Sequence, residues 1–181
     1  MLLAIRMKAD FLEYNDLLEK LSTISAIQIA TKGRALICLT GRSGSGKSTL
    51  GKAIRKNGLP NIPASRIAVI DDGVLAVPLL GLFTQRVKHS FDKIDELAPF
   101  ERYLHRKKVI VYVSSRPERR ISACDIVVRV SCDEEERRLR LLARNKDGER
   151  RFQQSSVESD IISIPAEHYF EFNSQKTYSR G

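Results

Sequence analysis

The chain has 181 residues, 42% of them hydrophobic, which is enough for one well-buried core and makes a single domain the default expectation. Its 31 Lys and Arg residues outnumber 22 Asp and Glu residues, and the net charge of +9 favours anionic partners such as nucleotides or nucleic acid. No apolar run approaches the roughly 18 residues of a membrane span, so we expect a cytoplasmic protein without a membrane segment. The three cysteines lack the spacing of a metal site and are expected to be reduced thiols.

The N-terminal residues are predicted to form a helical extension. Apolar side chains recur at roughly helical intervals before Lys32 and Gly33 interrupt the pattern, and they are Phe11, Leu12, Leu17, Leu18, Leu21 and Ile24. We therefore divide the chain into an extension over residues 1–32 and a main domain over residues 33–181.

The main domain alternates apolar runs of strand length with helical segments. Strands are predicted over residues 34–40, 66–72, 108–115 and 125–132, and a fifth short strand in the tail from residue 168. Helices are predicted over residues 46–58, ending at Gly58, over 91–108 with a break at Pro99, and over 133–148, ending at Gly148. This alternation predicts an α/β fold, in which a doubly wound, mostly parallel sheet is flanked by helices and binds ligands at the carboxyl ends of its strands.

The stretch GRSGSGKST carries the pattern Gly-x-x-x-x-Gly-Lys-Ser between the first strand and the first helix of the main domain. Glycines let such a loop turn its backbone N–H groups inward, and the following helix adds its positive dipole end. In this pattern Lys47 reaches the β- and γ-phosphates and the Ser48 hydroxyl binds Mg²⁺, which predicts ATP and Mg²⁺ as cofactors. The predicted nucleotide-binding residues are Gly41, Arg42, Ser43, Gly44, Ser45, Gly46, Lys47, Ser48 and Thr49.

Such a loop serves kinases, motor ATPases and GTPases alike. The chain is too short for the larger sheets or sensor modules of motor ATPases, and it has no Asn-Lys-x-Asp segment that would read guanine. These observations favour a kinase that phosphorylates a small molecule.

The order of several segments resembles the uridine kinase and phosphoribulokinase-like group within the nucleoside and nucleotide kinase superfamily. Over residues 34–152, GRSGSGKST, AVIDDGVL, HSFDKIDEL and CDIVVRVSCDEEERRLRLLARNKDGER follow one another as similar segments do in that group. The resemblance implies a P-loop NTPase fold with an arginine-bearing lid, and transfer of the γ-phosphate of ATP to a hydroxyl or phosphate of a small molecule, such as a nucleoside or nucleotide. The chain departs from the group at Val113-Ser114-Ser115, where the third strand often ends in an acidic residue, and at Leu141 and Leu142, where the lid usually has arginines.

Two aspartates directly follow the second predicted strand, at its carboxyl end beside the loop. Asp71 is predicted to act as general base towards the acceptor and to approach Mg²⁺, with Asp72 as the reserve for this role. Because side chains alternate along a strand, we expect only one of the two to point into the site. The alternative is a plain turn, since Asp-Asp-Gly is also a good strand exit.

The helix predicted over residues 133–148 carries a stripe of three arginines, which are Arg137, Arg140 and Arg144. Its predicted packing face consists of Leu139, Leu142 and Ala143. The segment from Arg144 to Arg151, with Gly148 as a pivot, is expected to close over ATP as a lid, and by the resemblance Arg144 and Arg150 clamp the transferring phosphoryl group. The alternative is an ordinary solvated helix, in which Glu134, Glu135 and Glu136 pair with the arginines.

A further basic group, formed by Arg116, Arg119 and Arg120, follows the third strand and suits either an anionic acceptor or a plain basic loop. Altogether the sequence predicts an ATP- and Mg²⁺-dependent P-loop kinase with a small-molecule acceptor. Its expected catalytic residues are Lys47, Asp71, Arg144 and Arg150, and its expected metal ligands are Ser48 and Asp71.

The rival interpretation is an ATP-binding regulatory or assembly module that contacts protein or nucleic acid and has no small-molecule acceptor. The missing acidic residue on the third strand favours this rival, whereas the lid arginines favour the kinase. Nucleic acid is therefore the less favoured partner.

Overall fold

The computed structural model of the chain describes residues 10–72, 76–79, 83–86, 97, 104–144, 146–156 and 164–175. Most of the helix expected over residues 91–108, including its break at Pro99, lies outside these described residues.

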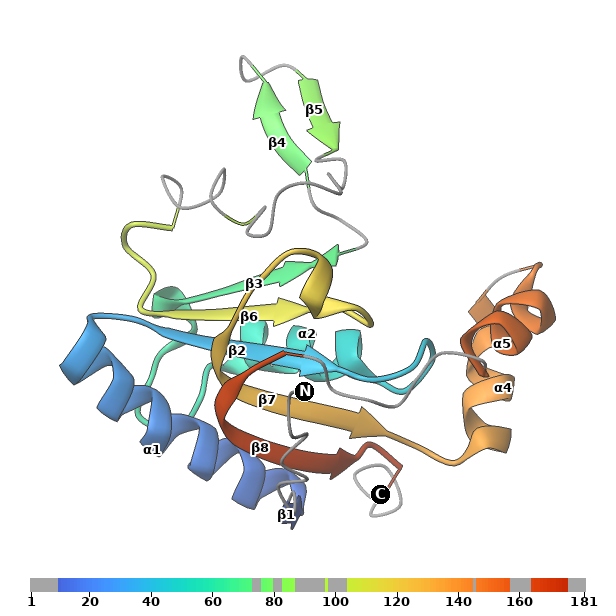
Figure 1. The fold of residues 1–181 in the computed structure, drawn as a ribbon, viewed down its shortest axis with the longest axis horizontal. Coiled ribbons are helices and arrows are strands. Elements are labelled where there is room, and N and C mark those ends of the chain that lie inside the picture. Colours follow the sequence, from blue (N-terminus) through green and yellow to red (C-terminus); the bar gives the residue numbers. More distant parts are fainter. Residues whose placement is uncertain are drawn as a thin grey trace, which may run out of the picture.

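The centre of the fold is a sheet of six strands in the order β1-β8-β7-β2-β6-β3 (Figure 1). Its strands are β1 (Asp10–Leu12), β2 (Ala35–Thr40), β3 (Ile67–Asp71), β6 (Val109–Val113), β7 (Cys124–Ser131) and β8 (Ala166–Asn173). Every neighbouring pair is parallel. The α/β class and the five predicted strands are thus confirmed. A separate antiparallel pair is formed by β4 (Ala76–Leu79) and β5 (Phe83–Arg86).

The described helices are α1 (Tyr14–Lys32), α2 (Lys47–Asn57), α4 (Glu134–Arg144) and α5 (Gly148–Ser156), and short 3₁₀ turns are η1 (Ala64–Arg66) and η3 (Pro117–Arg119). Helix α2 ends as predicted, because the Gly58 N–H donates to the carbonyl of Ile54 at 2.8 Å.

The helix expected to run to Gly148 is instead two helices. Helix α4 ends at Arg144, and Gly148 is the first residue of α5 rather than the end of α4. A side chain at Gly148 would place its Cβ 2.5 Å from the Leu141 carbonyl oxygen. A glycine is therefore required here because the two helices approach closely. In a sequence, such a glycine cannot be told from one that ends a helix.

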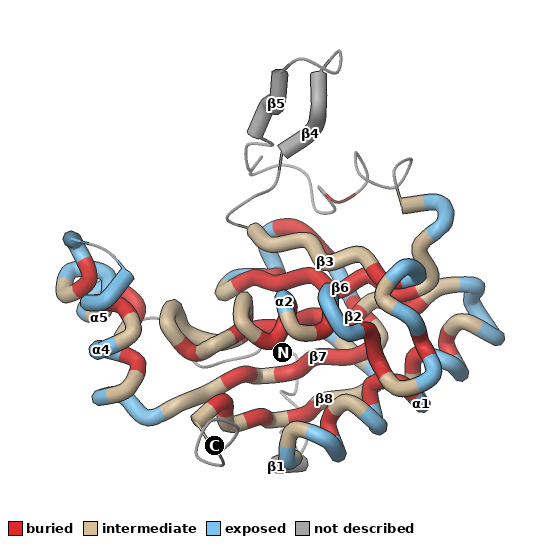
Figure 2. Tube along the Cα trace, turned by 180° about the vertical axis from the view of Figure 1, so that it is seen from behind, coloured by how far each residue is buried: buried red, intermediate tan, exposed pale blue. Residues whose placement is uncertain are grey.

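The central strands β2, β6 and β7 are largely buried (Figure 2), and apolar clusters lie on both faces of the sheet, which explains why these strands are apolar runs. Along β2, Ile37 and Leu39 belong to a cluster with α1 and α2, whereas Cys38 belongs to a second cluster on the opposite face. Leu17 and Leu21 of α1 are fully buried in the first cluster. The described part of the predicted N-terminal extension therefore shares a core with the sheet, and its strand β1 pairs with β8.

The chain changes direction at the middle of the sheet. From β2 it passes over to β3 at the edge, returns to β6, and then crosses to β7 and β8 on the other side of β2. Connections that leave neighbouring strands in opposite directions open a crevice at their carboxyl ends, where ligands of such folds bind. Figure 1 shows the arrowheads of these strands pointing towards the end of the molecule that carries α4 and α5.

Candidate functional site

A glycine loop over residues 41–46 joins the carboxyl end of β2 to the first turn of α2. Gly41 and Gly46 have φ angles of 135° and 101°, which side chains other than glycine rarely adopt. A Cβ at Gly41 would collide with the carbonyl oxygen of Val130, and one at Gly46 would lie 2.9 Å from the Cβ of Ser174. The spacing of glycines in the sequence thus reflects a loop pressed against β7 and the end of β8.

Lys47, the first residue of α2, is only 7% exposed. Its Nζ donates to the carbonyl oxygens of Gly41 at 2.6 Å and Arg42 at 2.8 Å, so the loop curls around the ammonium group. The loop and the helix N-terminus after it place a buried positive charge and the positive end of a helix dipole at one spot. Both favour an anion there.

Ser48 and Asp71, the two expected metal ligands, lie side by side. The Ser48 hydroxyl donates to Oδ2 of Asp71 at 2.8 Å, which brings the second residue of α2 against the last residue of β3. Among the residues that the structure describes, no three His, Cys, Asp or Glu side chains are grouped closely enough to hold a metal ion. A metal here would therefore be held by this hydroxyl and carboxylate together with ligands from water or substrate.

Asp72 has a different set of partners. Its carboxylate accepts hydrogen bonds from Arg120 at 2.8 Å, Ser114 at 3.1 Å and Tyr112 at 3.2 Å, and it forms an ion pair with Arg120. Burial raises the pKa of the Tyr112 phenol well above its usual value, which keeps this group protonated as a donor. None of these three partners of Asp72 was expected from the sequence, which suggested an anionic acceptor or a plain basic loop for Arg120.

A cavity of about 760 Å³ opens at the carboxyl ends of β2, β3 and β6. Its lining residues are Ser43, Gly44, Lys47, Ser48, Asp71, Asp72, Val113, Ser114, Ser115, Arg116, Arg119, Leu141, Arg144, Arg151 and Gln154. The expectation that only one aspartate would face the site is wrong, because both line this cavity. Strand β3 ends at Asp71, and the alternation of side chains does not extend to the residue after it.

Other predicted residues lie around this cavity in smaller pockets. Gly41, Arg42 and Ser45 line one of about 200 Å³ between the loop and the end of β7. Gly46 and Thr49 line another, described below.

The two expected lid arginines, Arg144 and Arg150, do not line the same cavity. Arg150 lies on α5 beside a pocket of about 350 Å³ that also contains Ser43 and Arg151. Of the predicted catalytic residues, the structure brings Lys47, Asp71 and Arg144 into one cavity and leaves Arg150 next to it.

The buried face of helix α4 is not the one predicted from the sequence. The expected packing residues Leu139 and Leu142 are 56% and 46% exposed, whereas Leu141 and Arg137 are 4% and 1% exposed. The reason is that α4 packs on the glycine loop and α5 rather than on the apolar sheet. Arg137 therefore belongs to the interior. It lines the pocket of about 200 Å³ between the loop and β7, but not the cavity of about 760 Å³.

The predicted pairing of α4 glutamates with its arginines occurs at two positions. Arg140 donates to Glu136 at 2.8 Å, and Arg137 donates to Glu134 at 2.6 Å. Arg140 also donates to the Ser174 hydroxyl, whose own hydrogen bond reaches the Ser45 carbonyl in the loop. Arg144 is exposed and lines two cavities.

Of the two cavity residues of α5, Arg151 was expected only as the last residue of the lid segment, and Gln154 was not singled out from the sequence. Their spacing of three residues places them on one face of a helix, and that spacing would have identified them if α5 had been recognised as a separate helix.

A second cavity of about 480 Å³, which the sequence did not indicate, adjoins the first and shares Arg144 with it. Its lining combines apolar and polar side chains. The apolar lining comes from Tyr14, Leu50, Ala53 and Phe172, and the polar lining from Thr49, Glu136, Arg140, Arg144 and Ser174, with Gly46 between them. A flat ring with polar edges suits such a pocket.

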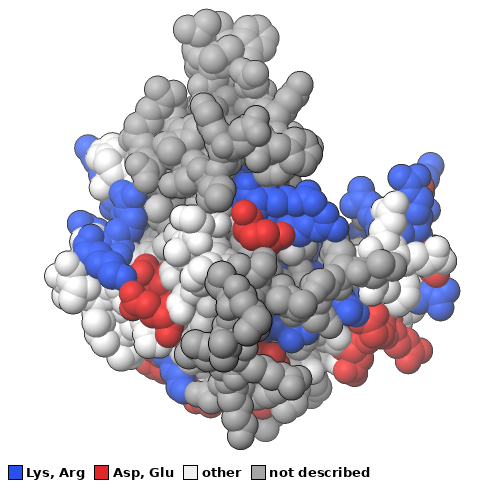
Figure 3. Space-filling view, in the orientation of Figure 1, with Lys and Arg blue, Asp and Glu red and all other residues white. Residues whose placement is uncertain are grey.

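Basic side chains gather near the middle of the face in Figure 3 and at the end that carries α4 and α5, with acidic side chains beside them. Among the described residues, five basic and two acidic side chains line the larger cavity. The site is therefore suited to polyanions.

Neither a protein-family model nor a curated protein matches the chain. Within the described residues, none of the helices combines the length and the apolar character that crossing a bilayer requires.

Proposed function

We propose that the protein is a P-loop kinase that transfers the γ-phosphate of ATP to a hydroxyl or phosphate of a small molecule. The observation that carries the proposal is the contact between Ser48, in the first turn of α2, and Asp71, at the carboxyl end of β3, beside the buried Lys47. A cation, a hydroxyl and a carboxylate in one cavity match the requirements of phosphoryl transfer, which are charge neutralisation, metal binding and positioning.

In this proposal the glycine loop cradles the phosphates of the donor nucleotide. Lys47 moves its ammonium group from the carbonyls of Gly41 and Arg42 to the β- and γ-phosphates, because phosphate oxygens carry far more negative charge than peptide carbonyls. Helix α2 contributes its dipole at the same place.

The residues present fit Mg²⁺. The oxygens of Ser48 and Asp71 are 2.8 Å apart, close to the roughly 2.9 Å between neighbouring ligands of an octahedral site with bonds of about 2.0–2.1 Å. Ser48 and Asp71 would hold the ion together with water and phosphate oxygens. The ion, when bound, neutralises charge on the phosphates and orients them.

The second cavity is the proposed site of the nucleobase. It adjoins the loop at Gly46 and the first turn of α2 at Thr49, and its apolar lining offers Phe172 and Leu50 to a flat ring. Arg144 lines both cavities, so it lies where the phosphates of a nucleotide that spans them would pass.

Asp71 is the proposed general base, because the charge of Asp72 is already balanced by Arg120 and its oxygens already accept three hydrogen bonds. The acceptor would lie beyond Asp71, against the Arg116 and Arg119 side of the cavity. Exposed arginines on this wall favour an acceptor that carries its own negative charge.

Helix α5, with Arg150 and Arg151, is the proposed lid.

The rival function, an ATP-binding regulatory or assembly module, is favoured by one specific observation. Strand β6 ends at Val113, and the next residue, Ser114, is 2% exposed and bonded to Asp72, so this strand supplies no carboxylate to the cavity.

The deciding experiment is a screen of phosphate transfer from radiolabelled ATP with Mg²⁺ to a panel of nucleosides, nucleotides, sugars and sugar phosphates. The kinase proposal expects at least one labelled product that disappears in the Lys47→Ala variant. Tight ATP binding without transfer to any member of the panel would favour the regulatory module. Absence of ATP binding would reject both.

A further inference from the structure

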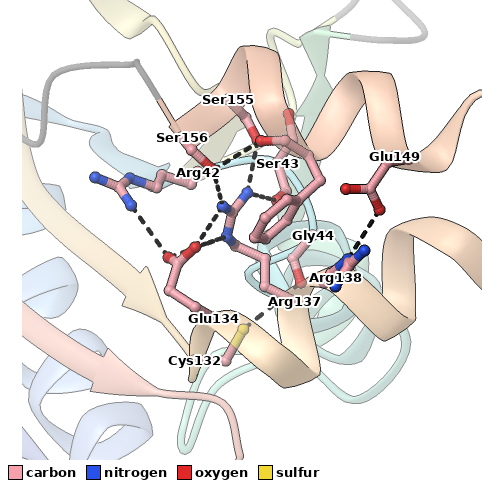
Figure 4. A network of polar contacts seen from close by, with 11 residues as sticks. Arg42, Ser43, Gly44, Cys132, Glu134, Arg137, Arg138, Glu149, Ser155 and Ser156 are labelled. Carbon is pink, nitrogen blue, oxygen red and sulfur yellow. Dashed lines mark hydrogen bonds and ion pairs between the residues drawn. The ribbon is translucent and has the colours of Figure 1, made fainter.

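Arg137 is the largest fully buried side chain among the described residues, although it is a charged group at the edge of the molecule. Its guanidinium has five N–H groups, and each of them meets an oxygen atom (Figure 4). The acceptors are the carboxylate of Glu134, the carbonyl of Ser43 at 3.3 Å, and the hydroxyls of Ser155 at 2.6 Å and Ser156 at 2.8 Å. A guanidinium whose N–H donors are all bonded within the protein is held in place and has none left for a ligand. We call Arg137 and these acceptors the joint.

This joint connects two parts of the candidate site. On one side it holds the glycine loop, directly through the Ser43 carbonyl and indirectly through Glu134, which also accepts a hydrogen bond from Arg42 at 3.1 Å. The stem of Arg137 presses on the same loop, since a Cβ at Gly44 would lie 3.1 Å from its Cγ. The loop is therefore fixed against the first turn of α4.

On the other side the joint holds the C-terminal end of α5. Besides Ser155 and Ser156, the ring of Phe152 stacks on the guanidinium, with 4.3 Å between the ring centre and the guanidinium carbon. These contacts come from one face of one helix turn. Arg151 and Gln154, which line the large cavity with Lys47 and Ser48, lie within the same stretch of α5.

We propose that Arg137 is a positioning residue that couples the glycine loop to α5, so that a nucleotide bound at the loop also holds Arg151 and Gln154 in place. This inference rests on the proposed nucleotide binding and adds the route by which the loop and α5 respond together. The geometry requires arginine, because only a planar fork reaches a carbonyl, a carboxylate and two hydroxyls at once, and lysine has no such fork.

The test is amide hydrogen exchange of the full chain with and without Mg²⁺ and a non-hydrolysable ATP analogue. In the unmodified protein the analogue slows exchange in the loop and also in residues 150–156. The expected factor at α5 lies within the roughly 5- to 150-fold range of coupling between sites. In Arg137→Lys the loop keeps its response, and the factor at α5 falls towards one.

A second variant protects the test against misfolding of the first. The double change Ser155→Ala and Ser156→Ala leaves the Arg137–Glu134 pair intact and removes only the α5 side of the joint. We expect it to lower the α5 response in the same direction.

The matched control is Arg138→Lys, on the same helix. Arg138 is exposed and also reaches α5, through its ion pair with Glu149 at 2.8 Å and the ring of Phe152 at 6.0 Å, but within the described residues it makes no hydrogen bond or ion pair to the glycine loop. Its replacement by lysine keeps the charge and should therefore leave unchanged the response of α5 to a nucleotide at the loop.

Failure of the inference and failure of the proposed function give different results. An α5 response that survives in both variants, or that is absent from the unmodified protein while the loop is protected, overturns the coupling alone. A loop that the analogue does not protect in the unmodified protein overturns the nucleotide-binding proposal, and the coupling with it.

Discussion

The Ser48 hydroxyl lies 2.8 Å from a carboxylate oxygen of Asp71, and each residue occupies the end of an element that the core holds firmly. Helix α2 is anchored by Leu50 and Ile54, which are 4% and 1% exposed, and β3 lies beside β6 in the sheet. The fold therefore fixes the distance between the two groups before any ligand binds. Such preorganisation is what a metal-assisted transfer requires, and it makes the following predictions specific.

Lys47→Ala is expected to weaken binding of an ATP analogue by roughly 10- to 150-fold, which corresponds to the loss of hydrogen bonds from a charged group worth about 1.5–3 kcal/mol. Calorimetric titration measures the loss, and circular dichroism checks that the variant is folded. Lys52→Ala, at an exposed position of the same helix, is the control and should bind normally. Unchanged affinity in folded Lys47→Ala would remove the loop from the proposal.

Asp71→Asn keeps the shape of the side chain and removes its capacity to accept a proton. Turnover should fall by about 10²- to 10⁴-fold, the usual contribution of a general base, while ATP affinity falls much less. Steady-state kinetics with an acceptor found in the screen measures both.

Asp72→Asn is expected to act on stability rather than on turnover. It leaves the side chain of Arg120, only 10% exposed, without its carboxylate, and a lost partner of this kind costs about 1–3 kcal/mol. Chemical denaturation measures this cost. A larger loss of rate at Asp72 than at Asp71 would assign the base to Asp72.

Arg144→Ala should lower phosphate transfer by about 10²-fold, as for the loss of one donor to a developing charge, and should leave adenosine binding nearly intact. Arg150→Ala should have a smaller effect, because Arg150 lies in the adjoining pocket. Single-turnover kinetics separates the two variants. Normal turnover combined with lower thermal stability would instead indicate that these arginines belong to an ordinary solvated helix.

The sequence was sufficient to predict five strands of the main sheet, the helix after the loop and the position of the loop, because these features depend on local signals. It did not predict β1, whose Phe11 and Leu12 fall within the predicted helical extension, or the pair β4 and β5. Continuous apolar runs, spaced glycines and a capping glycine each describe a few neighbouring residues. The position of Asp71 at a strand end followed from the same local pattern.

The interior of the α4 region was not predictable in this way. Reading Leu139 and Leu142 as the packing face assumed that α4 packs on an apolar sheet, but its neighbours are the polar loop and the serines of α5. Arg137 is buried because those neighbours supply oxygens, and no pattern within its own helix reveals them. The three donors to Asp72 come from the end of β6 and the turn after it, which are likewise distant in sequence.

The link between loop and α5 should also depend on pH through Glu134. The hydrogen bonds from Arg137, reinforced by Arg42, lower the pKa of this carboxyl below its ordinary value of 4.5. A lowered folded-state pKa contributes stability that is present above 4.5 and is lost as the pH falls through the folded value.

Glu134→Gln should therefore be less stable than the unmodified protein at neutral pH, and the difference should shrink as the pH falls below 4.5. Because the side chain is 54% exposed, the difference should also shrink in high salt. Urea denaturation at several pH values measures it. Glu135→Gln is the matched control, since within the described residues Glu135 forms no ion pair, and its stability should follow the unmodified protein across the same range. A difference for Glu134→Gln that stays constant from neutral to acidic pH would contradict the role assigned to the ionised carboxylate.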